Sequence, residues 1–196
     1  MTHKTQALNK ISQAISICQA CPLFQKATNP VPGQGNPEAK VVFIGEGPGS
    51  SEDQKGIPFC GRSGQLLDRL LQAINLSRSE VFITNIVKHR PPGNRDPLPG
   101  EIIACTPFLR NQLLAIRPRI IVTLGRFALN YFSPTDYISQ VHGQIKKLSW
   151  ESLDLSLMPL YHPAAGLRNG TVLKDIKKDF VKLGLFLKTI RLKPST

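Results

Sequence analysis

Three cysteines and one histidine are the residues of this chain whose types and spacing could bind a metal. Cys18 and Cys21 stand in Cys-Gln-Ala-Cys, so both thiolates can reach one metal centre from a single turn. Cys105 and His89 come from the middle of the chain. The remaining cysteine, Cys60, lies in a Pro-Phe-Cys-Gly segment that suits another purpose, so His89 is the better fourth ligand. The alternative is a bystander His89 beside a three-cysteine centre, and spacing alone does not separate iron–sulfur from zinc.

A second set of residues could bind a flat, polar ligand. Glu46 stands among closely spaced glycines, which let backbone amides approach a ligand. Phe59, between proline and glycine turns, suits stacking against a ring, and the Asn85 amide offers both a donor and an acceptor. His162 could donate a hydrogen bond to a developing anion. The structural alternatives are a core aromatic for Phe59, a capping role for Asn85 and a packed histidine for His162.

The elements that must position these residues alternate between strands and helices. Short β-branched runs predict strands over 41–44, 81–84, 120–123 and 157–160. Pro159 in the last run indicates an edge strand, because proline cannot donate to a ladder. Apolar residues at helical spacing predict helices over 66–74, 102–114, 127–131 and 172–190. This alternation predicts an α/β fold: a three-layer α/β/α sandwich with a central four-stranded parallel sheet, in one domain spanning residues 1–196. Ligands of such sheets bind beyond the carboxyl ends of the strands, where the polar residues lie.

The charge of the chain indicates its partner. Lys and Arg number 25 against 13 Asp and Glu, which gives a net charge of +12. A solvated basic surface is one explanation, but a polyanion such as nucleic acid is the commonest partner of such a surface. The start of the chain has no apolar signal segment, and no run reaches membrane-spanning length. We therefore expect an intracellular, cytoplasmic protein associated with the nucleoid, with no membrane partner.

Five ordered motifs give the sequence a specific resemblance. They lie at 45–53, 56–61, 84–88, 90–95 and 162–165. In order and spacing they resemble the motifs of family 4 uracil-DNA glycosylases, the iron–sulfur members of the uracil glycosylase superfamily. The resemblance runs from about Cys18 to the C-terminal helix. It implies a monofunctional hydrolase of DNA repair that flips uracil out of DNA, hydrolyses its N-glycosidic bond and leaves an abasic site.

The resemblance also implies roles for individual residues. Phe59 would stack on the flipped uracil, Asn85 would read its polar edge, and His162 would stabilise the uracil anion. Glu46 and Glu52 are candidates for positioning the attacking water, and Glu52 is favoured. The residues assigned to the base site are Gly45, Gly47, Phe59, Asn85 and His162.

The resemblance assigns DNA contacts to two further segments. Leu167 would fill the vacated stack as an apolar wedge, and Arg168 would contact a phosphate or the groove. Arg90, Asn94 and Arg95 would contact DNA from the loop after the second predicted strand. The expected substrate is uracil-containing DNA, single- or double-stranded, and the expected state is a monomer.

Departures from the family pattern set the riskiest prediction. Family 4 usually has Ala at Gly47 and Val at Cys60, and its third cluster cysteine stands where this chain has His89. The implied cofactor is a [4Fe-4S] cluster held by Cys18, Cys21, His89 and Cys105. A crosslinking branch of the superfamily shares Val-Lys-His here, but it carries a second histidine in a basic loop that is absent from residues 90–99. Turnover is therefore expected; the alternatives are covalent capture of uracil-DNA and a zinc-stabilised DNA-binding module.

Overall fold

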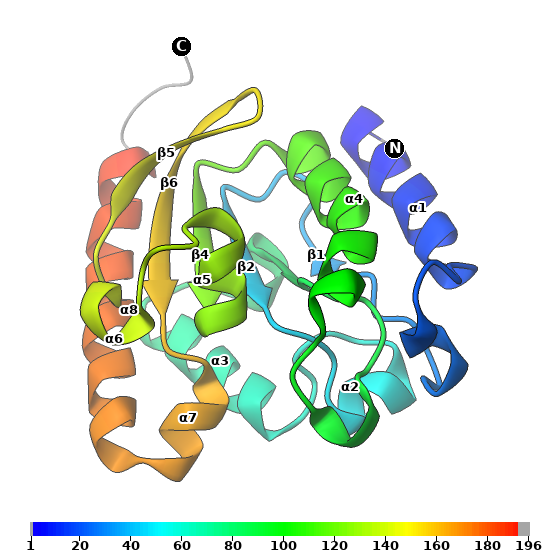
Figure 1. Cartoon of the computed structure of the whole chain (residues 1–196). Coiled ribbons are helices and arrows are strands. Elements are labelled where there is room, and N and C mark those ends of the chain that lie inside the picture. The colour runs from blue at the N-terminus through cyan, green and yellow to red at the C-terminus, as the bar shows by residue number, and fades with distance from the viewer. Residues whose placement is uncertain (1, 192–196) are drawn as a thin grey trace.

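A six-stranded sheet forms the centre of the computed structural model, which describes residues 2–191 (Figure 1). Its strand order is β1-β3-β2-β4-β6-β5. The strands are β1 Gln34–Gly35, β2 Val41–Gly45, β3 Phe82–Asn85, β4 Ile120–Leu124, β5 Lys146–Trp150 and β6 Leu153–Leu160. The four predicted strands are β2, β3, β4 and β6, and they run parallel, as predicted.

The outer strands differ from the prediction. β1 and β5 each pair antiparallel with a neighbour, so the sheet has two strands more than the four predicted. The prediction that the strand with Pro159 is an edge strand is wrong, because β6 lies between β4 and β5. Pairing with β5 ends at Leu157, opposite Lys146, so the proline falls beyond the ladder on that side. Its missing N–H therefore interrupts no hydrogen bond to β5.

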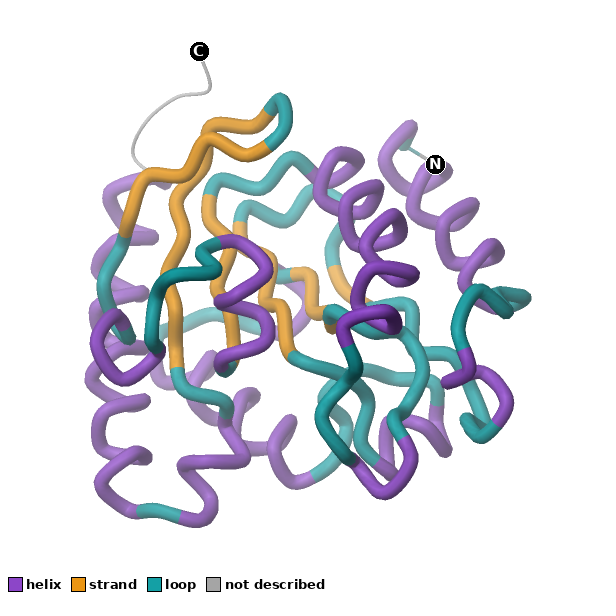
Figure 2. The backbone as a smooth tube through the Cα atoms, in the orientation of Figure 1, coloured by secondary structure: helices purple, strands orange, loops and turns teal. Residues whose placement is uncertain are grey.

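Helices cover both faces of the sheet, and Figure 2 shows how they enclose the strands. The helices are α1 His3–Ser16, α2 Ser50–Lys55, α3 Arg62–Ala73, α4 Pro99–Ile116, α5 Arg126–Phe132, α6 Ile138–Val141, α7 Pro163–Arg168 and α8 Gly170–Arg191, with short 3₁₀ turns η1 Pro22–Gln25, η2 Arg78–Glu80 and η3 Pro92–Asn94. One buried cluster joins the sheet to α3 and α8, and a second joins it to α1, α4 and α5. The predicted three-layer sandwich is confirmed.

Alternation along the strands explains the two layers. In β2, Val41 and Phe43 face the cluster under α3 and α8, whereas Val42 and Ile44 face the cluster under α4. Both sides are apolar, as a parallel sheet covered by helices requires. The apolar face predicted for the last helix is confirmed, because Ile176, Phe180, Leu183 and Leu187 are all buried in α8. None of the helices in residues 2–191 combines the length and apolar character needed to cross a bilayer.

Candidate active site

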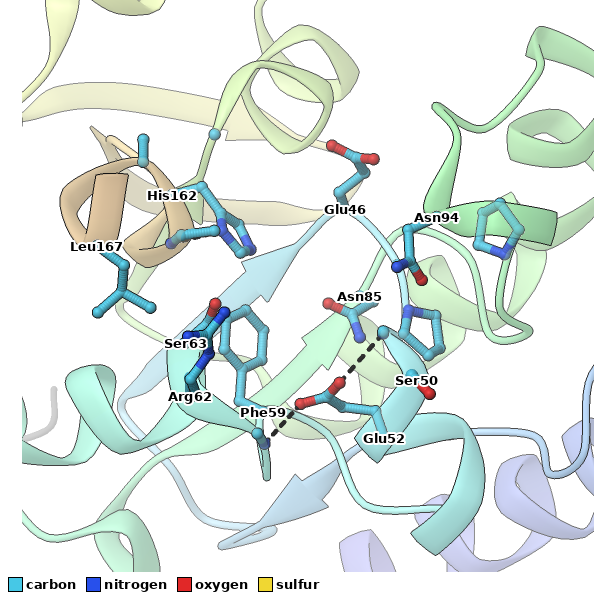
Figure 3. Close-up of a pocket in the computed structure, with 18 of the residues that line it drawn as sticks. Glu46, Ser50, Glu52, Phe59, Arg62, Ser63, Asn85, Asn94, His162 and Leu167 are labelled. Atoms are coloured by element: carbon cyan, nitrogen blue, oxygen red, sulfur yellow. Dashed lines mark hydrogen bonds between the residues drawn. The ribbon is translucent and has the colours of Figure 1, made fainter. Parts of the chain in front are cut away.

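A cleft of about 840 Å³ opens at the carboxyl ends of the parallel strands (Figure 3). Glu46 follows β2, Asn85 ends β3, and His162 follows β6. The residues predicted for the site that line this cleft are Glu46, Gly47, Glu52, Phe59, Asn85, Asn94, Arg95, His162, Leu167 and Arg168. Gly45 and Arg90 were also predicted, and neither lines it. The structure therefore brings together residues separated by more than a hundred positions.

The Asn85 amide is buried at the base of the cleft. Asn85 is 1% exposed, and its Oδ1 has no hydrogen-bond partner within residues 2–191. A Cβ on Gly45 would lie 2.5 Å from this Oδ1 and 2.6 Å from Cζ of Phe59, so only glycine fits behind the pair. An unpaired buried acceptor costs about 1–3 kcal/mol. A ligand that donates a hydrogen bond to Oδ1 would recover that cost.

Phe59 lies beside His162, with ring centroids 5.5 Å apart and planes inclined by 32°. Its backbone is left-handed, at φ 50°, which costs a residue other than glycine about 1–2 kcal/mol. The first turn of α3 approaches so closely that a Cβ on Gly64 would lie 1.7 Å from the Phe59 carbonyl oxygen. Arg78 donates to that same carbonyl at 3.0 Å. Neither Gly64 nor Arg78 was predicted, because a packing glycine and a lone arginine belong to no distinctive motif.

The His162 imidazole has a fixed orientation. Its Nδ1 accepts a hydrogen bond from the Ala164 N–H at 3.1 Å, so the neutral ring carries its proton on Nε2. Burial lowers the pKa of His162 to about 4; Glu52 opposes this shift and Arg168 adds to it. The ring is therefore neutral at pH 7 and can donate a hydrogen bond from Nε2.

The carboxylates of Glu46, on the loop after β2, and Glu52, in the first turn of α2, have different environments. Glu52 accepts hydrogen bonds from the Gly49 N–H at 3.1 Å and the Gly61 N–H at 2.8 Å (Figure 3). Each of its two carboxylate oxygens therefore binds one backbone amide. Glu46 accepts no hydrogen bond from the described residues. Burial raises the pKa of Glu46, the nearby Asp96 raises it further, and Arg126 lowers it. Glu52 thus shapes the loop, and Glu46 has a carboxylate free to act in the cleft.

The basic residues predicted to contact DNA divide into two groups. The Arg95 guanidinium forms a bidentate pair with the buried Glu101, at 2.9 and 2.6 Å, and Arg90 donates to Asn94 at 2.8 Å. These pairs order the loop before α4. Leu167 and Arg168 on α7 are instead exposed at the rim, Leu167 by 45%. Two arginines that the sequence analysis did not select, Arg62 and Arg126, also line the cleft.

The predicted metal ligands lie away from the cleft, and the structure gathers only part of the set. Cys21 packs against the buried cluster that contains Cys105, and Cys18 lies three residues before Cys21. Burial raises the pKa of the Cys105 thiol, Lys88 opposes this shift, and Cys21 and Cys18 add to it. The Lys88 backbone N–H donates to Cys105 Sγ at 3.4 Å, as N–H groups do toward ligand sulfurs. Burial lowers the pKa of His89, and the charge of Asp53 opposes this shift. None of the three cysteines contributes to the shift of His89.

The structure does not complete the predicted ligand set. Among residues 2–191, no three His, Cys, Asp or Glu side chains are close enough together to hold a metal ion. The structure therefore supplies the cysteine side chains but no assembled set of ligands. Ligation by His89 therefore stays a prediction.

Comparisons with known proteins agree with the motifs. The model of the uracil DNA glycosylase superfamily matches residues 32–183. A type-4 uracil-DNA glycosylase from Sulfurisphaera tokodaii is 44% identical over 183 residues, which cover 90% of this chain and 83% of that protein. The type-4 enzymes of Archaeoglobus fulgidus and Thermotoga maritima are 43% and 40% identical, over 91% and 93% of this chain and 92% and 98% of theirs. The chain therefore belongs to the type-4 family of the uracil DNA glycosylase superfamily.

Proposed function

We propose that this protein is a monofunctional uracil-DNA glycosylase, which extrudes uracil from DNA and hydrolyses its N-glycosidic bond. The observation that carries the proposal is the unpaired Asn85 Oδ1, buried in the same cleft as the Phe59 ring and a neutral His162. Relatives that cover nine-tenths of the chain bear the name of this activity. A base inside a duplex is out of reach of such a cleft, so it must be flipped out.

Recognition would depend on the Asn85 amide. Uracil has a donor at N3 and an acceptor at O4, so N3–H would donate to Asn85 Oδ1 and the amide NH₂ would donate to O4. Cytosine has an acceptor at N3 and a donor at N4, and it would leave the buried Oδ1 facing another acceptor. Phe59 would stack on the ring, and the missing side chain at Gly45 leaves the amide in place. Uracil therefore satisfies this amide, whereas cytosine does not.

Bond cleavage would depend on His162. Uracil leaves as an anion with charge at O2, and a neutral imidazole can donate Nε2–H to that oxygen without losing its own proton. The Ala164 N–H on Nδ1 fixes this tautomer before the substrate arrives. A preorganised donor of this kind contributes about 3 kcal/mol to transition-state stabilisation.

The water would be positioned by Glu46. The sequence analysis favoured Glu52, but the hydrogen bonds from Gly49 and Gly61 occupy both of its oxygens. Glu46 follows β2 directly and lines the cleft. Its ionised carboxylate would accept a proton from the attacking water and would face the positive charge that develops on the sugar.

DNA would bind across the rim of the cleft. Leu167 is exposed on α7 and would occupy the gap left by the flipped base, with Arg168 and Arg62 available to phosphates. Arg90 and Arg95 would act indirectly, through the loop that their hydrogen bonds with Asn94 and Glu101 order.

A [4Fe-4S] cluster is proposed at the cysteines, held by Cys18, Cys21 and Cys105, with His89 as the fourth ligand. The support is the packing of Cys21 against the cluster that contains Cys105, and the N–H donated to Cys105. When bound, the cluster would crosslink the segment after α1 to α4. The residues of the cleft would carry out the hydrolysis, and the cluster would order the segments on which they depend.

The direct test is incubation of purified, metal-loaded protein with single- and double-stranded DNA that contains one uracil. Alkali should then cleave the strand at the uracil, and thymine-containing DNA should stay intact. A protein–DNA band that survives denaturing electrophoresis would indicate covalent capture instead. Failure to cleave by a protein with intact metal would contradict the proposal.

A further inference from the structure

Arg78 binds the backbone on both sides of the Phe59 Cα. It lies at the start of η2, in the connection between α3 and β3. One guanidinium nitrogen, Nη1, donates to the Phe59 carbonyl at 3.0 Å, and the other, Nη2, donates to the Pro58 carbonyl. Nη1 also lies 3.0 Å from Oδ1 of Asp68 on α3, which anchors the side chain. No other side chain of the described residues binds two consecutive carbonyls in this segment.

These two carbonyls determine the conformation of Phe59. The Pro58 carbonyl sets the peptide plane before Phe59, and the Phe59 carbonyl sets the plane after it. The angles φ and ψ of Phe59 are the rotations that relate the two planes. A single planar guanidinium that binds both oxygens therefore holds Phe59 at its φ of 50°, a conformation that phenylalanine rarely adopts.

The same conformation aims the ring. With its backbone left-handed, Phe59 lines the cleft beside His162, while its carbonyl faces Gly64 and Arg78. Arg78 itself does not line this cleft; it lines a second one of about 470 Å³, together with Asp68 and Glu80. Arg78 thus influences the Phe59 ring only through the backbone of residues 58 and 59. It lies outside the cleft in which the base would bind.

We propose that Arg78 is the positioning residue for base stacking, because it fixes the backbone of Phe59 in the orientation that presents its ring to uracil. This inference rests on the proposed function. Lysine would not replace it, because an ammonium group lacks the planar fork that meets two oxygens and a carboxylate together. The Asp68 carboxylate keeps the fork oriented, so Asp68→Asn should give a weaker form of the same defect.

One test does not depend on activity. The chain has 4 histidines, so the ring protons of His162 can be assigned by NMR, with His162→Gln as the reference. The Phe59 ring is close enough to shift these resonances. Arg78→Met should move the His162 signals toward their values in Phe59→Ala. Arg69→Met, which removes the same charge from the exposed side of α3, should leave them unchanged. Unchanged His162 signals in folded Arg78→Met would overturn the proposal.

The second test measures excision under single turnover with saturating enzyme and single-stranded uracil-DNA. Arg78→Met should lower the rate about tenfold relative to Arg69→Met, while both variants bind uracil-free DNA equally well. In a Phe59→Ala background, Arg78→Met should lower the rate less than about twofold, because the ring it positions is gone.

The remaining variants separate positioning from simple destabilisation. Arg78→Lys should recover little of the rate, and Asp68→Asn should fall between Arg78→Met and the unchanged protein; both serve if Arg78→Met does not fold. Two results would overturn the proposal. One is that Arg78→Met lowers the excision rate as much in the Phe59→Ala background as in the unchanged protein. The other is that Arg78→Met and Arg69→Met have equal rates. If the unchanged protein excises no uracil, the proposed function fails, and the NMR comparison still decides the role of Arg78.

Discussion

The cleft lies at the carboxyl ends of the parallel strands, and the cysteines lie after α1 and on α4. The two regions differ in how completely the described residues define them. In the cleft, Glu52 holds two backbone amides, Ala164 fixes the His162 tautomer, and Arg78 holds Phe59. In the cysteine region, no three possible ligands among residues 2–191 lie close enough together to hold a metal ion. Protein hydrogen bonds preorganise the first region. The second would be ordered by the group proposed to bind there, as in metal sites that form on binding.

Lys88 connects the two regions. Its backbone N–H donates to Cys105, and its buried Nζ donates to the Asn85 carbonyl at 2.8 Å. Thr84 and Gln112 accept the other two Nζ hydrogen bonds, at 2.7 and 2.9 Å. All three protons of the ammonium are therefore paired in the interior. Asn85 and Cys105 are thus joined through the hydrogen bonds of one residue, Lys88.

The largest effect should come from the donor in the cleft. His162→Ala should lower the single-turnover excision rate about 100- to 1000-fold, because it removes the hydrogen bond to the leaving uracil anion. The exposed His3→Ala is the matched control and should keep the full rate. Thermal unfolding should show that both variants are folded at the assay temperature, with His162→Ala the less stable because it loses the hydrogen bond from Ala164. A near-normal excision rate for His162→Ala would show that the His162 side chain is not needed for bond cleavage.

Substitutions of Glu46 and Glu52 should change different properties: the excision rate for Glu46 and the stability for Glu52. Glu46→Gln should lower excision about 10- to 100-fold with little change in stability, because it removes a base from the cleft. Glu52→Gln should cost about 1–3 kcal/mol of unfolding free energy, because an amide cannot accept from both glycine N–H groups. Rates under single turnover and urea unfolding distinguish the two. The reverse pattern would restore Glu52 as the residue that positions water.

The sequence predicted this site unevenly, for physical reasons. The strand ends at Glu46, Asn85 and His162 could be predicted because buried parallel strands are continuous apolar runs that stop at polar residues. The edge strands β1 and β5 could not, since their residues are exposed or half-exposed and their pairing depends on neighbours distant in sequence. Arg78 was missed because its role is a contact with main-chain oxygens, which leaves no sequence pattern.

The hydrogen bonds of Lys88, which connect the cleft to the cysteine region, should contribute to the free energy of unfolding. Lys88→Met should lower the unfolding free energy by about 1–3 kcal/mol, because Thr84, Asn85 and Gln112 would each lose a donor in the interior. Lys177→Met, an exposed change on α8, should have no measurable effect. Equal stability of the two variants by urea unfolding would show that the network contributes nothing.

The pH dependence of stability should report on His162. The folded pKa is about 4 and the unfolded value about 6.5, so between these values the unfolded chain binds the proton and the folded chain does not. Stability should therefore fall as pH decreases from 6.5 to 4. His162→Gln should show a shallower decrease over this window in unfolding measurements. Identical slopes for the two proteins would mean that the ring is not desolvated.

The cysteine region should affect excision least. Cys105→Ala should lower the metal content and the melting temperature, but the protein that stays folded should keep its excision rate within about tenfold. Iron, zinc and sulfide analysis of the unchanged protein and of His89→Ala tests the ligand set in the same preparation. Full metal retention by His89→Ala would show that His89 is a bystander.

We expect the cleft to release free uracil from DNA with multiple turnovers. The most direct measurement is chromatography of the base released when a small amount of protein is incubated with excess uracil-containing single-stranded DNA, beside Asn85→Ala. We expect many equivalents of uracil per protein, an alkali-labile site in the DNA, and a large loss in Asn85→Ala. No uracil release, or release that stops at one equivalent with the protein bound covalently to DNA, would contradict the account.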